Sequence, residues 1–152
     1  MATPTSSNSS IFPTARIKQA QKLLFLINGV LLTFIGTVAA LSDFIAYQTG
    51  NGPLGAKLFN APYAVGFFEL HGLTAFFGIL LLTMARRTLT PNWHLAAAAF
   101  HLFLAAGIMI FWQGAVAWGV ATAEAVTAVL HVAFATAHCL LYVRVSRLAV
   151  MR

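Results

Sequence analysis

Three ionisable side chains follow one another at seven-residue steps near the end of the chain: Glu124, His131 and His138. Because an α-helix returns to the same side after three or four residues, these steps place all three on one face. The other positions of this face are small or aromatic, namely Ala121, Ala128, Ala135 and Tyr142. Ionisable groups in an otherwise apolar helix are costly and typically mark a ligand site or a proton relay.

Three more histidines and two more acidic residues lie in or beside the other apolar segments: His71, His94, His101, Asp43 and Glu69. Counting about 1.5 Å per residue from the middle of each segment, we expect His71, His101 and His131 at similar depths. All three acidic residues then fall in one half of the bundle. His138 and His94 fall in the other half, with His94 at the membrane interface.

Imidazoles from two helices are suitable axial ligands of a haem iron. The pair that we predict is His71 with His131, because small residues leave space beside both rings: Ala75, Gly78, Ala128 and Ala135. His101 and His138 form an alternative pair. His131 and His138 are only about 10.5 Å apart along one helix, which favours a single haem.

Two short stretches resemble a known family. Glu69-Leu70-His71-Gly72 and the segment Leu130-His131-Val132-Ala133-Phe134-Ala135 look like parts of one four-helix half of haem A synthase and related b-type membrane cytochromes. In that family, histidines on alternate helices of the bundle hold a haem b. The resemblance therefore implies a bundle that holds a haem, and nothing finer.

A bare metal ion is a second possibility for the same residues. His71, His101 and His131, with Glu69 or Glu124, offer nitrogen and oxygen ligands for Zn, Cu or Fe. Glu69 and His71 are two residues apart and hence about 200° apart around a helix, so they do not point at one ion. Chlorophyll-type pigments also accept an imidazole and stay open as an alternative.

Proton passage is the third possibility. Chains of Glu and His side chains relay protons across membranes. Glu124, His131 and His138 descend a single stripe across much of the bilayer, which is the pattern of a half-channel. This hypothesis is compatible with the haem hypothesis, because cytochromes that react with quinones also need protons at buried sites.

The composition shows where these residues lie. Hydrophobic residues make up 60% and charged residues 8% of the 152 positions, with a mean hydropathy of +0.84. Soluble domains contain about 25% charged residues, so the chain is predicted to be an integral membrane protein. Its one cysteine, Cys139, lies inside an apolar run and cannot form an internal disulfide.

Four apolar runs are long enough to cross a bilayer. We expect spans at about 23–42, 63–85, 93–112 and 120–143. Together they make an all-α, antiparallel four-helix membrane domain over residues 16–152, preceded by a disordered tail over residues 1–15. The long connector is expected at Asp43–Pro62 and a shorter one at Gln113–Gly119, while Gly29 and Gly36 give the first span a smooth strip for close packing.

The basic residues predict the orientation. Eight of the nine flank one side of the expected bundle, namely Arg16, Lys18, Lys22, Arg86, Arg87, Arg144, Arg147 and Arg152, and only Lys57 lies opposite. Cytoplasmic loops carry an excess of Lys and Arg, so both termini are expected in the cytoplasm. The net charge of +6 therefore reflects membrane topology, and nucleic acid is not an expected partner.

The sequence favours a b-type haem protein that passes electrons, with a quinone or within a larger redox complex in a bacterial inner membrane or its equivalent. As an enzyme it would be a haem-dependent oxidoreductase, although no catalytic residue is assigned. Two alternatives stay open: a cofactor-free accessory subunit of a membrane complex, and intramembrane transport of metal ions or protons. The expected partners are lipid and other membrane subunits or copies of the chain.

Overall fold

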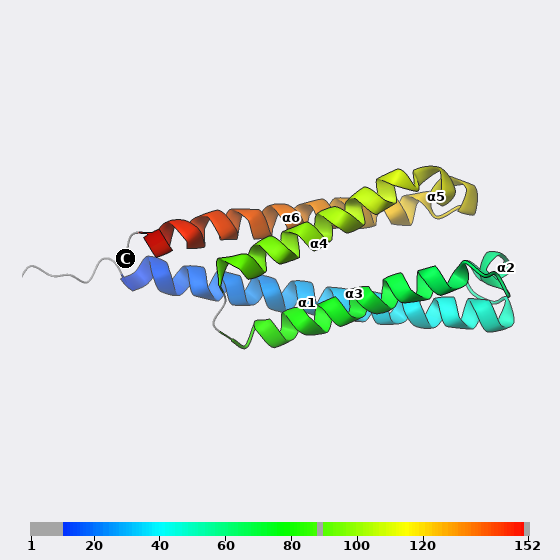
Figure 1. The fold of residues 1–152 in the computed structure, drawn as a ribbon, viewed down its shortest axis with the longest axis horizontal. Coiled ribbons are helices and arrows are strands. Elements are labelled where there is room, and N and C mark those ends of the chain that lie inside the picture. Colours follow the sequence, from blue (N-terminus) through cyan, green and yellow to red (C-terminus); the bar gives the residue numbers. More distant parts are fainter. Residues whose placement is uncertain (1–10, 88–89, 151–152) are drawn as a thin grey trace, which may run out of the picture.

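The computed structural model describes residues 11–87 and 90–150, which form six helices and, within these ranges, no strand. The helices are α1 (Ile11–Thr49), α2 (Gly55–Leu58), α3 (Ala64–Met84), α4 (Pro91–Ile110), α5 (Trp112–Trp118) and α6 (Ala121–Val150) (Figure 1). Four of them, α1, α3, α4 and α6, are long and apolar enough to cross a membrane. The prediction of an all-α protein with four membrane-spanning helices is confirmed.

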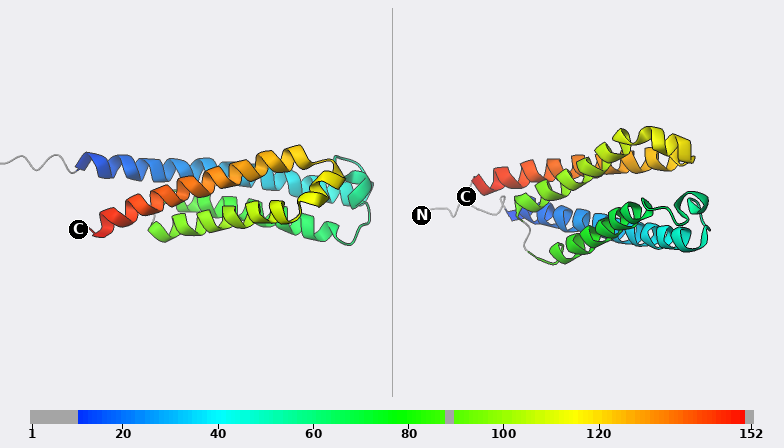
Figure 2. Two further views of the ribbon diagram at one scale, coloured as in Figure 1. Left: turned by 90° about the horizontal axis from the view of Figure 1, so that it is seen from above. Right: turned by 45° about the vertical axis from the view of Figure 1, so that its right-hand side comes forward.

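The long helices form two antiparallel hairpins. α1 packs along α3 and α4 packs along α6, with a smaller contact between α1 and α6 (Figures 1 and 2). The short helices α2 and α5 lie together at the end opposite the start of α1. There Lys57 donates a hydrogen bond to the carbonyl of Ala117 at 3.2 Å, which links the connectors of the two hairpins.

Glycines allow α1 and α3 to approach closely. A Cβ atom at Gly36 would lie 2.8 Å from the carbonyl oxygen of His71, and one at Gly29 would lie 2.8 Å from the side chain of Leu82. Such separations are shorter than van der Waals contact, so larger residues would push the helices apart. The strip of Gly29 and Gly36 therefore serves close packing, as expected.

The apolar side chains divide between an interior and an outer surface. Phe25, Leu81 and Ala97 belong to a buried cluster, and Ala46 and Leu58 belong to another at the far end. Large apolar residues on all four long helices are exposed, for example Phe34, Phe76, Phe103 and Val129. An exposed surface of this composition suits contact with lipid.

The first helix is longer than the predicted span. It begins at Ile11 and so includes residues 11–15, which we expected in the tail, while residues 1–10 lie outside the described ranges. It ends at Thr49, which places Asp43 on the helix and not in a connector. The residue that follows the helix explains where it ends. Gly50 has a φ of 73°, and its N–H donates to the carbonyl of Ala46; a glycine in this conformation is typical of a helix C-terminus.

The second connector also differs from the prediction. Residues 112–118 form α5, where we expected a loop, and the helix ends at Gly119, whose φ is 75°. The ring of Trp118 lies 5.0 Å from that of Phe67 and 5.9 Å from that of Tyr63, measured between centroids. These aromatic contacts pack the end of α5 against the start of α3.

The described basic residues gather at one end of the bundle. α1 begins, α3 ends and α6 ends there (Figure 1), and these segments carry Arg16, Lys18, Lys22, Arg86, Arg87, Arg144 and Arg147. Among the basic residues that the structure describes, Lys57 alone lies at the other end, and Arg152 lies outside the described ranges. The cytoplasmic location of this end stays a prediction from the positive-inside rule.

Candidate functional site

Four histidines lie inside the bundle, two on α4 and two on α6. His94, His101 and His138 are fully buried, and His131 is 8% exposed. On each helix the two histidines are seven residues apart, so both point to the same side. Alanines separate them, with Ala97 and Ala98 buried on α4 and Ala135 buried on α6, and these small side chains allow the two helices to lie close together.

The histidines pair across the two helices. Nδ1 of His101 lies 2.9 Å from Nδ1 of His131, and Nδ1 of His94 lies 3.0 Å from Nδ1 of His138. α4 and α6 run in opposite directions, and both have histidines seven residues apart. When His101 lies beside His131, His94 therefore also lies beside His138. The two pairs lie about 10.5 Å apart along the helices.

The first helix supplies two amide side chains to the histidines. Nδ2 of Asn28 donates to Nε2 of His101 at 2.8 Å and to Nε2 of His138 at 2.9 Å. Nε2 of Gln21 lies 3.1 Å from Nε2 of His94. Both amides are buried, with Gln21 5% and Asn28 0% exposed, so hydrogen bonds to the imidazoles satisfy groups that water does not reach.

These contacts join six side chains into one hydrogen-bonded chain, called here the histidine–amide chain. Its order is Gln21, His94, His138, Asn28, His101 and His131. Aromatic rings close it in: Phe25 meets His94 and His138 edge-on, with centroids 4.8 and 5.1 Å apart, and Phe134 stacks on His101 at 5.2 Å. The chain thus lies in a dry interior, where polar contacts are strong.

A second polar contact lies in the other half of the bundle. Nδ1 of His71, on α3, lies 2.5 Å from Oδ2 of Asp43, on α1. The side chain of Asp43 is 6% exposed and that of His71 is 32% exposed. On α1, Asp43 lies fifteen residues beyond Asn28, which corresponds to about 22 Å of helix. The Asp43–His71 pair is therefore a separate site.

The structure brings together some of the predicted site residues but not all. His101, His131 and His138 share one cluster, whereas His71 contacts α1, Glu69 is exposed, and Glu124 lies in the first turn of α6. His94, expected at the membrane interface, also belongs to this cluster, because its ring is buried between His138 on α6 and Gln21 on α1. Its depth in the membrane stays a prediction.

The sequence interpretation also missed the two amides of α1. Gln21 and Asn28 are seven residues apart, the same step that separates His94 from His101 and His131 from His138. This shared step was the available signal. Amides carry no charge, so in an apolar helix they are a weaker signal than the histidines.

The histidine pairs do not match the geometry of a bis-imidazole haem. Two nitrogens on opposite sides of one metal ion lie about 4 Å apart, twice a metal–nitrogen bond of about 2 Å. The Nδ1 atoms of the two pairs are 2.9 and 3.0 Å apart, so no macrocycle fits between them. Within residues 11–87 and 90–150, no three His, Cys, Asp or Glu side chains are grouped to hold a metal ion. A haem between His71 and His131 stays a prediction.

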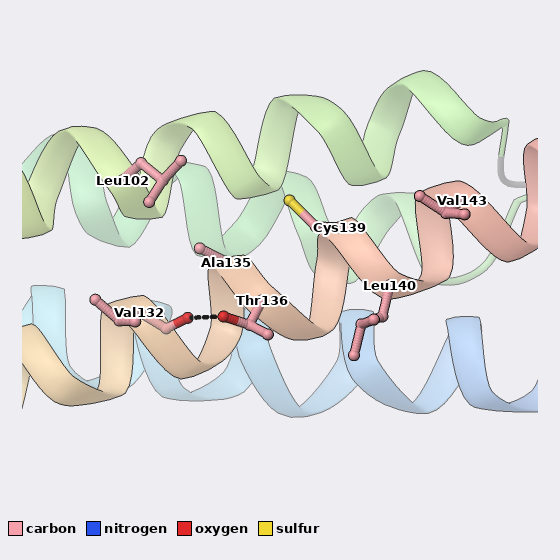
Figure 3. A pocket seen from close by; sticks show the side chains of 7 residues that line it. All are labelled: Leu102, Val132, Ala135, Thr136, Cys139, Leu140 and Val143. Carbon is pink, nitrogen blue, oxygen red and sulfur yellow. Dashed lines mark hydrogen bonds between the residues drawn. The ribbon is translucent and has the colours of Figure 1, made fainter.

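A shallow groove of about 280 Å³ lies elsewhere, on the surface formed by α4 and α6 (Figure 3). It is lined by Leu102, Val132, Ala135, Thr136, Cys139, Leu140 and Val143. The hydroxyl of Thr136 donates to the carbonyl of Val132 on its own helix. The groove therefore offers an apolar surface that suits lipid, and the buried histidines do not line it.

Comparisons with known proteins do not add an identity. No protein-family model, curated protein or solved structure matches the chain. The resemblance of its short histidine-containing stretches to haem A synthase thus stays a prediction.

Proposed function

We propose that this protein carries protons through the interior of the membrane along the histidine–amide chain. The observation that carries the proposal is the unbroken series of hydrogen bonds that links four imidazoles and two amides between Gln21 and His131. Buried ionisable chains of this kind in membrane helices are typical of proton relays. The proposal makes no use of a bound cofactor.

Imidazole is suited to this role because it has a proton-binding nitrogen on each side of the ring. A proton that arrives at the free nitrogen of one ring forms an N–H bond there. The N–H bond on the opposite side of the same ring then breaks, and its proton passes to the next ring. Each imidazole gains one proton and loses one, so a charge moves and each ring is left in its other tautomer. The ring returns to its first tautomer, by turning over, before the next proton follows in the same direction.

The location of the chain supports passage from the basic end of the bundle. Gln21 and His94 lie near that end, at the starts of the membrane-spanning parts of α1 and α4, and His101 lies near the middle of α4. The Asp43–His71 pair lies in the opposite half. Complete passage across the membrane therefore involves this pair as the second proton-binding station of the proposed route.

Proton flux into vesicles tests the proposal. The purified protein is reconstituted into liposomes, a potassium diffusion potential is applied with valinomycin, and an enclosed dye reports the internal pH. Wild-type protein should raise the flux above that of protein-free vesicles, and His101→Phe, which keeps a ring but removes both ring nitrogens, should return it to that level. Cys139→Ser, an exposed change outside the chain, is the matched control.

The same experiment separates the relay from a purely structural role. Hydrogen bonds between membrane helices also stabilise a bundle, at about 0.6 kcal/mol each. If wild-type flux equals that of protein-free vesicles while the protein is folded, the relay is overturned, and the histidines then act as contacts between the helices of a cofactor-free subunit.

A further inference from the structure

We infer that Asn28 divides the proposed relay into two halves and controls passage between them. The inference rests on the proposed function and concerns one property of the histidine–amide chain, which is the direction of its hydrogen bonds. A chain conducts a proton only if each member accepts on one side and donates on the other. Asn28, in the middle of the chain, breaks this condition.

The contacts of Asn28 show why. Its Nδ2 atom lies 2.8 Å from Nε2 of His101 and 2.9 Å from Nε2 of His138. An amide NH₂ group only donates, so both Nε2 atoms accept. Each neutral ring then carries its proton on Nδ1, from which His101 donates to His131 and His138 donates to His94. His94 then carries its proton on Nε2, and the Gln21 amide presents its oxygen at the 3.1 Å contact, since the two ends of an amide are assigned from the hydrogen-bond network. The hydrogen bonds point away from Asn28 in both directions.

The direction of the hydrogen bonds depends on which atom of the Asn28 amide each ring contacts. In the structure Oδ1 of Asn28 lies 3.1 Å from Nε2 of His101, and the two ends of an amide are assigned from the hydrogen-bond network. If the oxygen faced both rings, it would accept from both Nε2 atoms and the hydrogen bonds would point toward Asn28. In both of these cases His101 and His138 have the same tautomer, and the direction reverses at Asn28. A continuous direction would need Oδ1 to accept from His101 while Nδ2 donates to His138. Nδ2 is the nearer amide atom to His101, at 2.8 Å against 3.1 Å for Oδ1, which favours the reversal.

A proton that reaches either ring therefore stops at the amide. The amide nitrogen has no site that binds a proton from one imidazole while it releases another to the next. The rings of His101 and His138 are 6.2 Å apart between centroids, and both Nε2 atoms face Asn28, so direct transfer requires the Asn28 side chain to turn away. Movement of this one side chain then sets the rate of the relay.

The chain contains a matched comparison for Asn28. Gln21 is also a buried amide, but it contacts a single imidazole, that of His94, at the end of the chain. An amide in that position does not separate two halves of the relay. The same chemical change at the two amides should therefore have different effects on proton flux.

Nitrogen-15 NMR of the imidazoles tests the inference without measuring flux. In wild-type protein labelled at histidine, His101 and His138 should have the same neutral tautomer, with the proton on Nδ1 in the orientation of the structure. Assignment uses His101→Phe and His138→Phe. Opposite tautomers in the two rings would give the hydrogen bonds one continuous direction and would overturn the inference.

Flux through carboxylate variants is the second test. Asn28→Asp replaces the amide by an isosteric group that accepts a proton from one ring and passes it to the other, so flux should rise about tenfold. Asn28→Leu, which removes the bridge, and Gln21→Glu, which changes the terminal amide, should show no such rise. Equal flux in Asn28→Asp and wild-type protein overturns the inference, whereas flux at the protein-free level in every protein overturns the proposed function.

Discussion

Asn28 and His101 are 73 residues apart in the chain and hydrogen bond at 2.8 Å, and the same separation of 73 residues joins Gln21 to His94. The match arises because α1 and α4 run in the same direction and both repeat their polar residues at a seven-residue step. The step recurs on α6 as His131 and His138. Three helices thus place polar side chains in two layers, one with Gln21, His94 and His138 and the other with Asn28, His101 and His131. These layers fix how far each helix is shifted along its neighbours, as a buried Asn does in a coiled coil.

Removal of the central amide should destabilise the protein. In Asn28→Leu, the Nε2 atoms of two buried imidazoles lose their donor, and an unsatisfied buried polar group costs about 1–3 kcal/mol. The free energy of unfolding in detergent, measured by denaturant titration, should fall by about that amount. Thr136→Val is the control, because this exposed hydroxyl bonds to its own helix, and its stability should stay within about 0.5 kcal/mol of wild type. Equal stabilities of the two variants would contradict the prediction.

The close contact of α1 with α3 predicts opposite effects for two glycines. A Cβ atom at Gly36 would meet the backbone of α3 at His71 and Ala75, whereas one at Gly72 would meet nothing within 4 Å. Gly36→Ala should therefore lower the free energy of unfolding by about 1–3 kcal/mol through overpacking. Gly72→Ala should leave it unchanged or raise it by up to about 1 kcal/mol, because alanine loses less backbone entropy in a helix. A loss of stability in Gly72→Ala alone would contradict this.

The sequence predicted the four spans because hydropathy is a local property of each segment. It also predicted that His131 and His138 share a face, since the positions of residues on one helix follow from helix geometry alone. The contacts between helices could not be predicted in this way. Depth in the membrane placed His71 beside His131, but depth does not give the rotation of a helix about its axis, and in the structure His71 faces Asp43 on α1.

The end of the first span shows a second limit of the local signals. Turn-forming residues begin at Gly50, yet the sequence predicts that the span stops before Asp43, because this acidic residue interrupts the apolar run. In the structure Asp43 is buried against His71, so the helix continues past it to Thr49. From the sequence alone, a charged residue predicts the end of a membrane span, because its partner on another helix is not known.

A double-mutant cycle tests the Asp43–His71 pair. Asp43→Leu and His71→Leu each leave a polar partner without its contact, and the double variant replaces both by apolar groups. The double variant should lose less stability than the sum of the losses in the two single variants. The difference is the coupling energy, expected to be about 0.5–3 kcal/mol. The free energies of unfolding of the four proteins give this value. A coupling energy near zero would mean that the pair contributes nothing to stability.

The distribution of basic residues predicts the orientation of the bundle in a cell. The end that carries Arg86, Arg87 and Arg144 should be cytoplasmic, and the connector with Lys57 should lie on the other side. A fluorescent protein fused after the last residue should therefore fluoresce, while alkaline phosphatase inserted after Gly52 should be active. Phosphatase activity at the C-terminus and none at Gly52 would reverse the orientation and the direction of the proposed relay.

Visible spectra distinguish the relay from the haem hypothesis. The relay needs the four buried imidazoles to bind one another and the two amides, so protein purified from cells supplied with haem should show no Soret band and no reduced-minus-oxidised difference. A bis-histidine haem would instead give both signals and would separate nitrogens that lie 2.9 and 3.0 Å apart in the structure. A Soret band that is lost in His131→Ala and in His71→Ala, but kept in His94→Ala, would establish the His71–His131 haem and overturn the relay as the function of these residues.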